Sequence, residues 1–122
     1  MTTTTSLFRE TPGGEIVPAG KTIFVSGDVA DHLFIVQTGR VDIKRGDGIL
    51  ETVGPGGMFG EMAMIDGSTR SADAVAADDS KILAIDRTRF EFLITETPYF
   101  ARTVLKVLVD RLRSATTATS CT

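Results

Sequence analysis

The chain has 122 residues, 42% of them hydrophobic and 24% charged, which is the balance of one ordinary globular domain. Its 13 basic and 16 acidic residues give a net charge of −3, without the basic face expected of a nucleic-acid binder. A single cysteine, Cys121, excludes an internal disulfide and favours a reducing compartment. The chain shows neither a secretory signal pattern nor an apolar run long enough to span a membrane. We therefore expect a cytoplasmic protein with no membrane partner and no direct nucleic-acid binding.

Short apolar or alternating segments, separated by turn residues, predict a series of β-strands. They cover residues 15–17, 21–25, 32–37, 40–44, 49–53, 71–77 and 81–85. Segment 32–37 is apolar without alternation, which predicts burial on both faces, and Arg45-Gly46-Asp47-Gly48 predicts a hairpin turn. In the Thr-rich residues 1–14, expected to be flexible, only Leu7 and Phe8 are candidates to dock on the domain. Strands repeating every 8–12 residues or so indicate an antiparallel sandwich or barrel.

The hydrophobic period changes to that of a helix after Asp86, a predicted N-cap. One face of this helix carries Phe90, Leu93 and Ile94. A second helix is predicted from Pro98, with an apolar stripe formed by Val104, Leu105, Leu108 and Leu112. Residues 114–122 are small and polar and are predicted to be a flexible tail. The predicted fold is mainly β with flanking α: an antiparallel β-roll (a jelly-roll-like barrel) followed by two C-terminal helices.

Residues suited to catalysis or metal binding are too few to form a centre. The only histidine, His32, begins an apolar strand and is interpreted as a partly buried strand residue. Cys121 lies on the tail, and no serine sits in a G-x-S-x-G motif. The adjacent carboxylates Asp78 and Asp79 fall in a predicted turn. We expect neither an enzyme nor a metal protein.

The stretch Gly54–Val75 is the part of the sequence that best suits a ligand. Gly60 allows a ligand to approach the backbone closely, and a helical turn beginning at Glu61 would expose backbone N–H groups. An ionised Glu61 accepts hydrogen bonds from sugar hydroxyls, Arg70 can bind two phosphate oxygens, and Ser71 adds a hydroxyl. The alternative is a surface ion pair between Glu61 and Arg70, worth less than ~1 kcal/mol, and spacing alone does not decide between the two.

The run Phe59–Met64 (F-G-E-M-A-M), followed by Thr69–Ala72 (T-R-S-A), resembles the phosphate-binding cassette of cyclic-nucleotide-binding domains. This family includes the catabolite activator protein, protein kinase A regulatory subunits and cyclic-nucleotide-regulated channels. Similar features at residues 18–20, 33–39 and 54–56 extend the resemblance over residues 15–113.

The resemblance implies a set of ligand-binding residues. Glu61 would bind the ribose 2′-hydroxyl, Arg70 the cyclic phosphate, and Ser71 the phosphate or the base. The remaining contacts would come from Gly60, Met62, Ala63 and Ala72. Beside the purine, the resemblance places Ile43 and Leu50 as an apolar wall, with ordinary core packing as the alternative for both.

Three departures from the family pattern affect what is expected. Thr69 stands where many relatives have proline, and the absence of tryptophan means that a purine lid must come from the last helix or the tail, near Arg113–Thr117. Only residues 114–122 remain after the second helix, which is too short for a DNA-reading domain. The expected organisation is a stand-alone cyclic-nucleotide-binding domain at 15–113, between flexible segments 1–14 and 114–122.

The function predicted from this resemblance is that of a regulatory domain in signal transduction. It would bind a cyclic mononucleotide, cyclic AMP more readily than cyclic GMP and without any other cofactor, and signal as its C-terminal helices repack. Its partner would be another protein, or a second copy bound through the C-terminal helix. Two alternatives remain: a transcription-regulator-like protein acting through a partner, and a scaffold that binds no ligand.

Overall fold

The computed structural model describes residue 8 and residues 11–120, with side chains described up to residue 113. The elements in chain order are β1 (Glu15–Val17), β2 (Thr22–Phe24), β3 (His32–Thr38), β4 (Val41–Arg45), β5 (Gly48–Val53), β6 (Met58–Phe59), α1 (Glu61–Asp66), β7 (Asp73–Ala76), β8 (Ser80–Asp86), α2 (Arg87–Glu96) and α3 (Pro98–Ser120).

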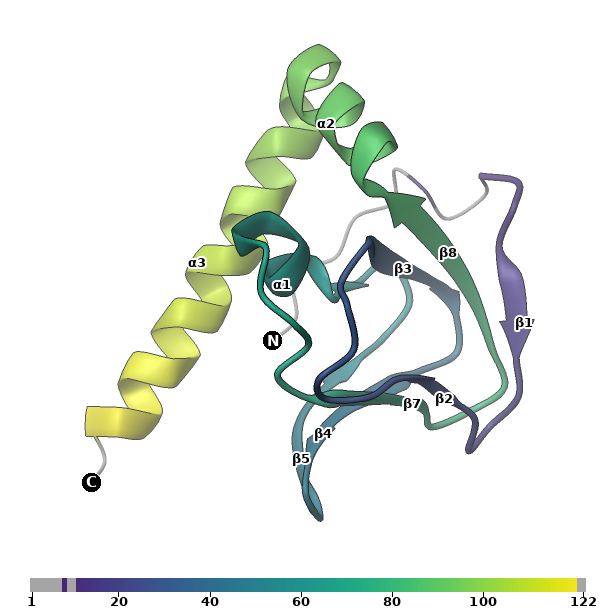
Figure 1. Ribbon diagram of the computed structural model, residues 1–122, viewed down its shortest axis with the longest axis vertical. Helices are drawn as coiled ribbons and strands as arrows, with labels where there is room; N and C mark the ends of the chain where they lie inside the picture. Colours follow the sequence, from purple (N-terminus) through teal and green to yellow (C-terminus); the bar gives the residue numbers. More distant parts are fainter. Residues whose placement is uncertain (1–7, 9–10, 121–122) are drawn as a thin grey trace.

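The strands form two four-stranded antiparallel sheets, ordered β1-β8-β3-β6 and β2-β7-β4-β5, and together they make a β-roll (Figure 1). The helices α2 and α3 follow the last strand, and the short helix α1 lies between β6 and β7 in the chain (Figure 1). The predicted fold class is therefore confirmed. The predicted hairpin turn joins β4 and β5, with Arg45 opposite Gly48. The two-residue strand β6 was not predicted, because the sequence pattern places Phe59 in the helical turn that follows.

Strand β3 carries the two hydrophobic cores of the molecule on its opposite faces. Leu33 and Ile35 belong to a core under the helices, which also contains Met64, Phe100 and Val104. Val36 belongs to a second core between the sheets, formed with Val41, Val53, Phe59, Ala74 and Ile82. Because successive side chains of a strand point to opposite faces, a strand that separates two cores must be apolar at nearly every position. The predicted burial of both faces of this segment is confirmed.

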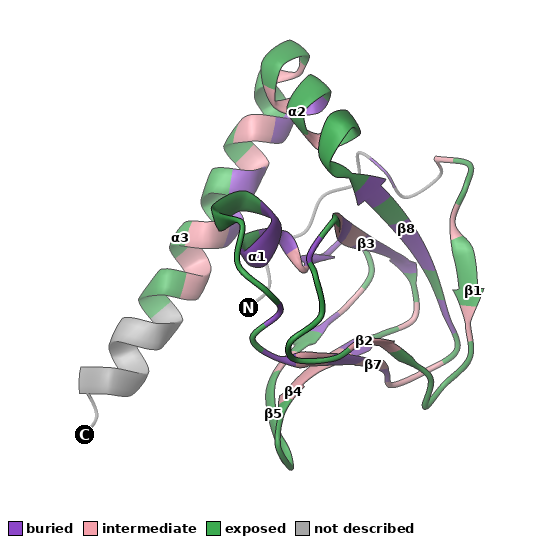
Figure 2. Cartoon of the chain, in the orientation of Figure 1, coloured by how far each residue is buried: buried purple, intermediate pink, exposed green. Residues whose placement is uncertain are grey.

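The helix α3 turns a different face to the core than the sequence predicted. Val104 and Val107 are buried, whereas Leu105 and Leu112 are 63% and 67% exposed. The outward face of α3 is exposed along much of its described length (Figure 2). The predicted stripe was wrong at these two leucines, because apolar residues occupy more than one face of this helix and sequence spacing could not choose among them. The helix also continues to Ser120, beyond the expected end at Arg113.

The N-terminal segment is held against the sheet by a buried glutamine. The side-chain Nε2 of Gln37 donates hydrogen bonds to the carbonyls of Phe8 and Thr11, both at 2.8 Å. The Phe8 ring is buried and meets the Phe100 ring edge-on, with 5.5 Å between the ring centroids. Phe8 thus docks as predicted, while Leu7 and the rest of residues 1–7 lie outside the described residues.

The first turn of α2 is capped by Asp86, whose side chain accepts a hydrogen bond from the backbone N of Arg89 at 2.8 Å. We expect Asp86→Ala to lower the free energy of unfolding by about 1 kcal/mol, because it leaves this helix N–H without its acceptor. The measurement is urea denaturation of the wild type and the variant. Asp86→Asn is the matched control, since asparagine caps as well as aspartate; equal losses in both variants would contradict a capping role.

Candidate functional site

The predicted site begins at Gly60, which links strand β6 to helix α1. Gly60 has a φ of 80°, a left-handed conformation that residues with a Cβ rarely adopt. A Cβ at this position would lie 2.9 Å from Nη1 of Arg70 and 3.2 Å from the Phe34 ring. Both its backbone angle and the close approach of Arg70 therefore require glycine here.

Arg70 is 5% exposed, and its guanidinium faces the Gly60 turn. Nη1 donates to the carbonyl oxygen of Gly60 and Nη2 to that of His32, each at 2.5 Å. The guanidinium also lies over the Phe24 ring, with Cζ 4.2 Å from the centroid. Its Nε is buried and has no hydrogen-bond acceptor among the residues that the structure describes. The arginine thus keeps an unpaired donor in a site made of two backbone carbonyls and an aromatic ring.

Burial lowers the pKa of the Arg70 guanidinium below its ordinary value, while the charges of Asp31 and Asp28 act in the opposite direction. An arginine remains protonated despite such a shift, so a positive charge is held inside the protein. The backbone on either side is fixed: the Arg70 N–H donates to Asp28 and the Arg70 carbonyl accepts from Gly27. Thr69 forms a β-bridge with Val29, so the segment that carries Arg70 is anchored without a proline at position 69.

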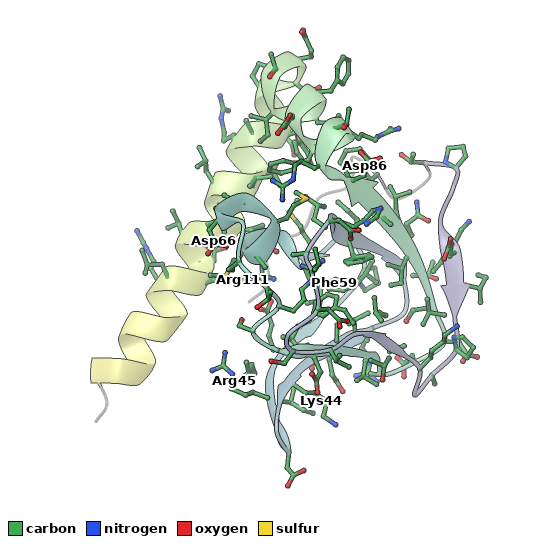
Figure 3. The ribbon with its side chains drawn as sticks, in the orientation of Figure 1. Lys44, Arg45, Phe59, Asp66, Asp86 and Arg111 are labelled. Carbon is green, nitrogen blue, oxygen red and sulfur yellow. The ribbon has the colours of Figure 1, made fainter. Side chains whose placement is uncertain are left out.

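Glu61, the first residue of α1, is the buried acid of the site. Its side chain is 1% exposed, and its Oε1 accepts a hydrogen bond from Nη1 of Arg111. Arg111 belongs to α3 and projects between that helix and the β-roll (Figure 3). The Gly60 carbonyl accepts a hydrogen bond from Arg70, and Glu61 is the next residue in the chain. The buried Arg70 and the buried Glu61 are therefore brought together by the turn at Gly60.

The other predicted cassette residues lie around the same turn. Ala63 and Ala72 are buried, whereas Met62 and Ser71 are exposed. The Ser71 carbonyl accepts a hydrogen bond from Nε of Arg45 at 3.3 Å, so the β4–β5 hairpin contacts the Thr69–Ala72 part of the cassette.

The two residues predicted to line a purine pocket differ in their surroundings. Ile43 is partly buried and packs against the core between the sheets, which fits the core-packing alternative. Leu50 is 55% exposed on strand β5. Their role toward a base stays a prediction. Of the predicted lid, Arg113 is exposed, and the side chains of residues 114–117 lie outside the described part of the chain.

Arg111 is the site residue that sequence reasoning missed. Besides Glu61, it binds Glu51 of β5 through Nε at 3.0 Å and the Met58 carbonyl through Nη2 at 2.7 Å. Arg111 is separated by 60 positions from Glu51 and by 50 from Glu61, so no local pattern joins them. The one available signal was a charge next to the predicted apolar stripe of the last helix.

The arrangement suits a ligand that combines an anion with hydroxyl groups. A buried arginine with an unpaired N–H favours a phosphate-like group, and a buried carboxylate accepts hydrogen bonds from hydroxyls. In the described part of the chain, no three histidine, cysteine, aspartate or glutamate residues are grouped so that they could hold a metal ion. No helix in that part is long and apolar enough to cross a bilayer.

The β-roll with a buried arginine and a buried acid beside one glycine turn is the fold of a known family, which the sequence comparison names. The family model described as the cyclic nucleotide-binding domain matches residues 15–97, which is more than half of the chain. The protein belongs to the cyclic-nucleotide-binding domain family. The match contains the whole predicted cassette and ends at the junction between α2 and α3.

Individual relatives agree with this assignment. The cyclic AMP receptor protein of Thermus thermophilus is 38% identical over 105 residues, covering 82% of this chain and 49% of the receptor. The crystal structure of the Thermus thermophilus catabolite activator protein superposes with a TM-score of 0.80 at 35% identity, covering 89% of this chain and 54% of that one. A second solved structure comes from work on a cyclic-GMP-dependent signalling pathway that regulates bacterial phytopathogenesis. It superposes with a TM-score of 0.79 at 28% identity, covering 93% of this chain and 98% of that one. The chain thus spans about half the length of the Thermus relatives.

Proposed function

We propose that this protein is a regulatory domain that binds cyclic AMP, and cyclic GMP less tightly, and that it performs no catalytic step. Arg70 pairs with the cyclic phosphate and Glu61 accepts the ribose 2′-hydroxyl. Backbone groups near Gly60, with Met62, Ala63, Ser71 and Ala72, complete the site. The preference for cyclic AMP rests on the Thermus relative, which is named a cyclic AMP receptor. Cyclic GMP remains the alternative ligand, because a similar solved structure comes from work on a cyclic-GMP-dependent pathway.

The observation that carries the proposal is the buried Nε of Arg70, which has no acceptor among the described residues. A buried donor left unpaired costs about 1–3 kcal/mol, and a ligand that accepts a hydrogen bond from it would remove this cost. An anion seated against Arg70 would supply the acceptor. A simple surface ion pair with Glu61 does not fit the geometry, because Arg70 donates to two carbonyls and Glu61 binds Arg111.

For the output of the domain, we propose that ligand binding repacks the C-terminal helices and that the signal passes through α3. The outward face of α3 carries Leu105, Val109 and Leu112, which are exposed and spaced four and three residues apart. An apolar helix face of this spacing is suited to pack against another helix, in a partner protein or a second copy.

We also propose residues 15–113 as the limits of the cyclic-nucleotide-binding domain.

The role of Glu61 is tested by comparing cyclic AMP with its 2′-deoxy analogue. We expect the wild type to bind cyclic AMP roughly 10- to 150-fold more tightly than the analogue, because one hydrogen bond to a charged group is worth roughly 1.5–3 kcal/mol. In Glu61→Gln this preference should shrink to a few-fold, since the neutral amide is a weaker acceptor. Isothermal titration calorimetry on both proteins gives the four affinities.

Asp66→Asn is the control, because Asp66 is exposed and its side chain caps the neighbouring Ser68. It should keep the wild-type preference for the ribose. The proposed function would be overturned if the wild type bound neither cyclic AMP nor cyclic GMP. An unchanged preference in Glu61→Gln would instead remove only the role given to Glu61. A parallel titration with cyclic GMP shows which of the two cyclic nucleotides binds more tightly.

A further inference from the structure

The ring of Phe24 covers one face of the Arg70 guanidinium. Cζ of Arg70 lies 4.2 Å from the centroid of the Phe24 ring and 5.7 Å from that of Phe34. A Cβ at Gly60 would lie 3.3 Å from the Phe24 ring and 3.2 Å from the Phe34 ring. Both rings therefore reach the glycine turn of the candidate site, and Phe24 is the nearer one to the buried cation.

Backbone hydrogen bonds fix the segment that carries Phe24 against the segment that carries Arg70. Phe24 is the last residue of β2 and pairs with Ala74 of β7, the strand that follows Arg70. In the loop after Phe24, the Gly27 N–H donates to the Arg70 carbonyl at 2.8 Å. The Arg70 N–H donates to the Asp28 carbonyl at 2.9 Å. The ring and the guanidinium thus come from two segments that are held together at several points.

An aromatic ring holds a cation without using its hydrogen-bond donors. The carbonyls of Gly60 and His32 accept from Nη1 and Nη2 of Arg70, and Phe24 lies against a face of the same group. Nε keeps a buried N–H that has no acceptor within the described part of the chain. The ring attracts the positive charge but accepts no strong hydrogen bond. A carboxylate in its place would pair with the N–H groups and neutralise the charge, so it would compete with an anionic ligand.

We infer that Phe24 is a positioning residue for phosphate recognition: its ring holds the Arg70 guanidinium at the Gly60 turn and keeps water from one of its faces, while the N–H donors stay available to the cyclic phosphate. The inference rests on the proposed function, because that function assigns Arg70 to the phosphate. It adds a residue that acts through Arg70 and that the sequence pattern placed only in a strand.

Loss of the ring should weaken ligand binding for two reasons. Without the ring, the guanidinium can leave the orientation that faces the phosphate, and the apparent affinity falls with the fraction of molecules that keep it. Water that reaches the uncovered face also screens the charge, and the ligand must displace this water. We expect Phe24→Leu to bind cyclic AMP roughly 2- to 30-fold more weakly than the wild type, the range that corresponds to one cation–π contact.

A change confined to the electrons of the ring separates this role from simple packing. Trifluorophenylalanine at position 24 nearly keeps the volume of phenylalanine but has a less negative ring face, so it attracts the cation less. Isothermal titration calorimetry with cyclic AMP is performed on the full chain as wild type, as Phe24→Leu and with the fluorinated ring. Ile82→Val is the control, because Ile82 lies in the core that Phe24 packs against. We expect weaker binding in the first two variants and wild-type affinity in Ile82→Val.

The Nε–H group of Arg70 gives a second, direct measurement. Its signal in nitrogen–proton correlation spectra is assigned by its loss in Arg70→Lys. We expect its exchange with water to be faster in Phe24→Leu and with the fluorinated ring than in the wild type, because the cover over the guanidinium is weaker. Addition of cyclic AMP to the wild type should shift this signal, as the N–H gains an acceptor.

The fluorinated chain keeps the test decisive if Phe24→Leu folds poorly, since both measurements can be made on it. Equal affinities of the fluorinated chain and the wild type would overturn the inference and leave Phe24 as a core residue. Weaker binding with unchanged exchange of the Arg70 Nε–H would also overturn it, because Phe24 would then act on the ligand without Arg70. A flat wild-type titration refutes the proposed function itself.

Discussion

Replacing Arg70 with alanine is expected to weaken cyclic AMP binding by about 1.5–3 kcal/mol, the value of a hydrogen bond to a charged group. The Arg70 guanidinium is bonded to the Gly60 carbonyl, so its loss removes the charge that faces the proposed phosphate. The same change leaves the carbonyls of Gly60 and His32 without their donors, which adds a stability cost of about 1–3 kcal/mol. Calorimetry measures the first effect and urea denaturation the second.

Two further variants separate these effects. Arg70→Lys keeps the charge but loses the planar fork, so it should recover only part of the affinity. Arg40→Ala removes an exposed arginine paired with Asp78 and should change stability by less than about 1 kcal/mol, with no change in binding. A loss of stability in Arg70→Ala with undiminished affinity would show that Arg70 has a structural role only.

Phe100→Ala is expected to cause the largest loss of stability, about 3–5 kcal/mol, as for other large buried aromatic residues. Phe100 is 0% exposed at the start of α3. Its ring meets the edges of Phe8 and Phe90, with centroid distances of 5.5 and 5.9 Å. Removal of the ring would open a cavity where the N-terminal segment, α2 and α3 meet. Urea denaturation measures this loss as a lower midpoint urea concentration, with no change in the dependence of the unfolding free energy on urea.

The neighbouring Tyr99 provides the control for this substitution. It is 58% exposed, so Tyr99→Ala should change the free energy of unfolding by no more than about 0.5 kcal/mol. Similar small losses in both variants would mean that the junction at Phe100 unfolds separately from the rest of the domain.

Features set by neighbouring residues could be predicted from the sequence. The turn between β4 and β5 follows from the Gly-Asp-Gly sequence at 46–48, and the cap at Asp86 follows from the change to helical period after it. Burial of both faces of β3 follows from an apolar run too short for a helix. Each of these depends on a few adjacent side chains and one backbone geometry.

Features set by distant contacts could not be predicted. The helix α3 is apolar on several faces, and the face that is buried depends on where Phe100 and Val104 join the core beside β3. The partners of Arg70 include a carbonyl 38 residues away, and those of Arg111 lie 50 to 60 residues away. The family resemblance implied that Glu61 and Arg70 serve one site, whereas the contacts of Arg111 depend on tertiary packing.

The buried amide of Gln37 bears on where this domain can be cut. A fragment limited to the family match, residues 15–97, would keep Gly60, Glu61 and Arg70. It would lose the carbonyls of Phe8 and Thr11 that accept hydrogen bonds from Nε2 of Gln37, together with the whole of α3. The core on the Leu33 and Ile35 face of β3 would also lose Phe8, Phe100 and Val104. We therefore expect a fragment limited to the family match to be less stable than one that begins before Phe8 and retains α3.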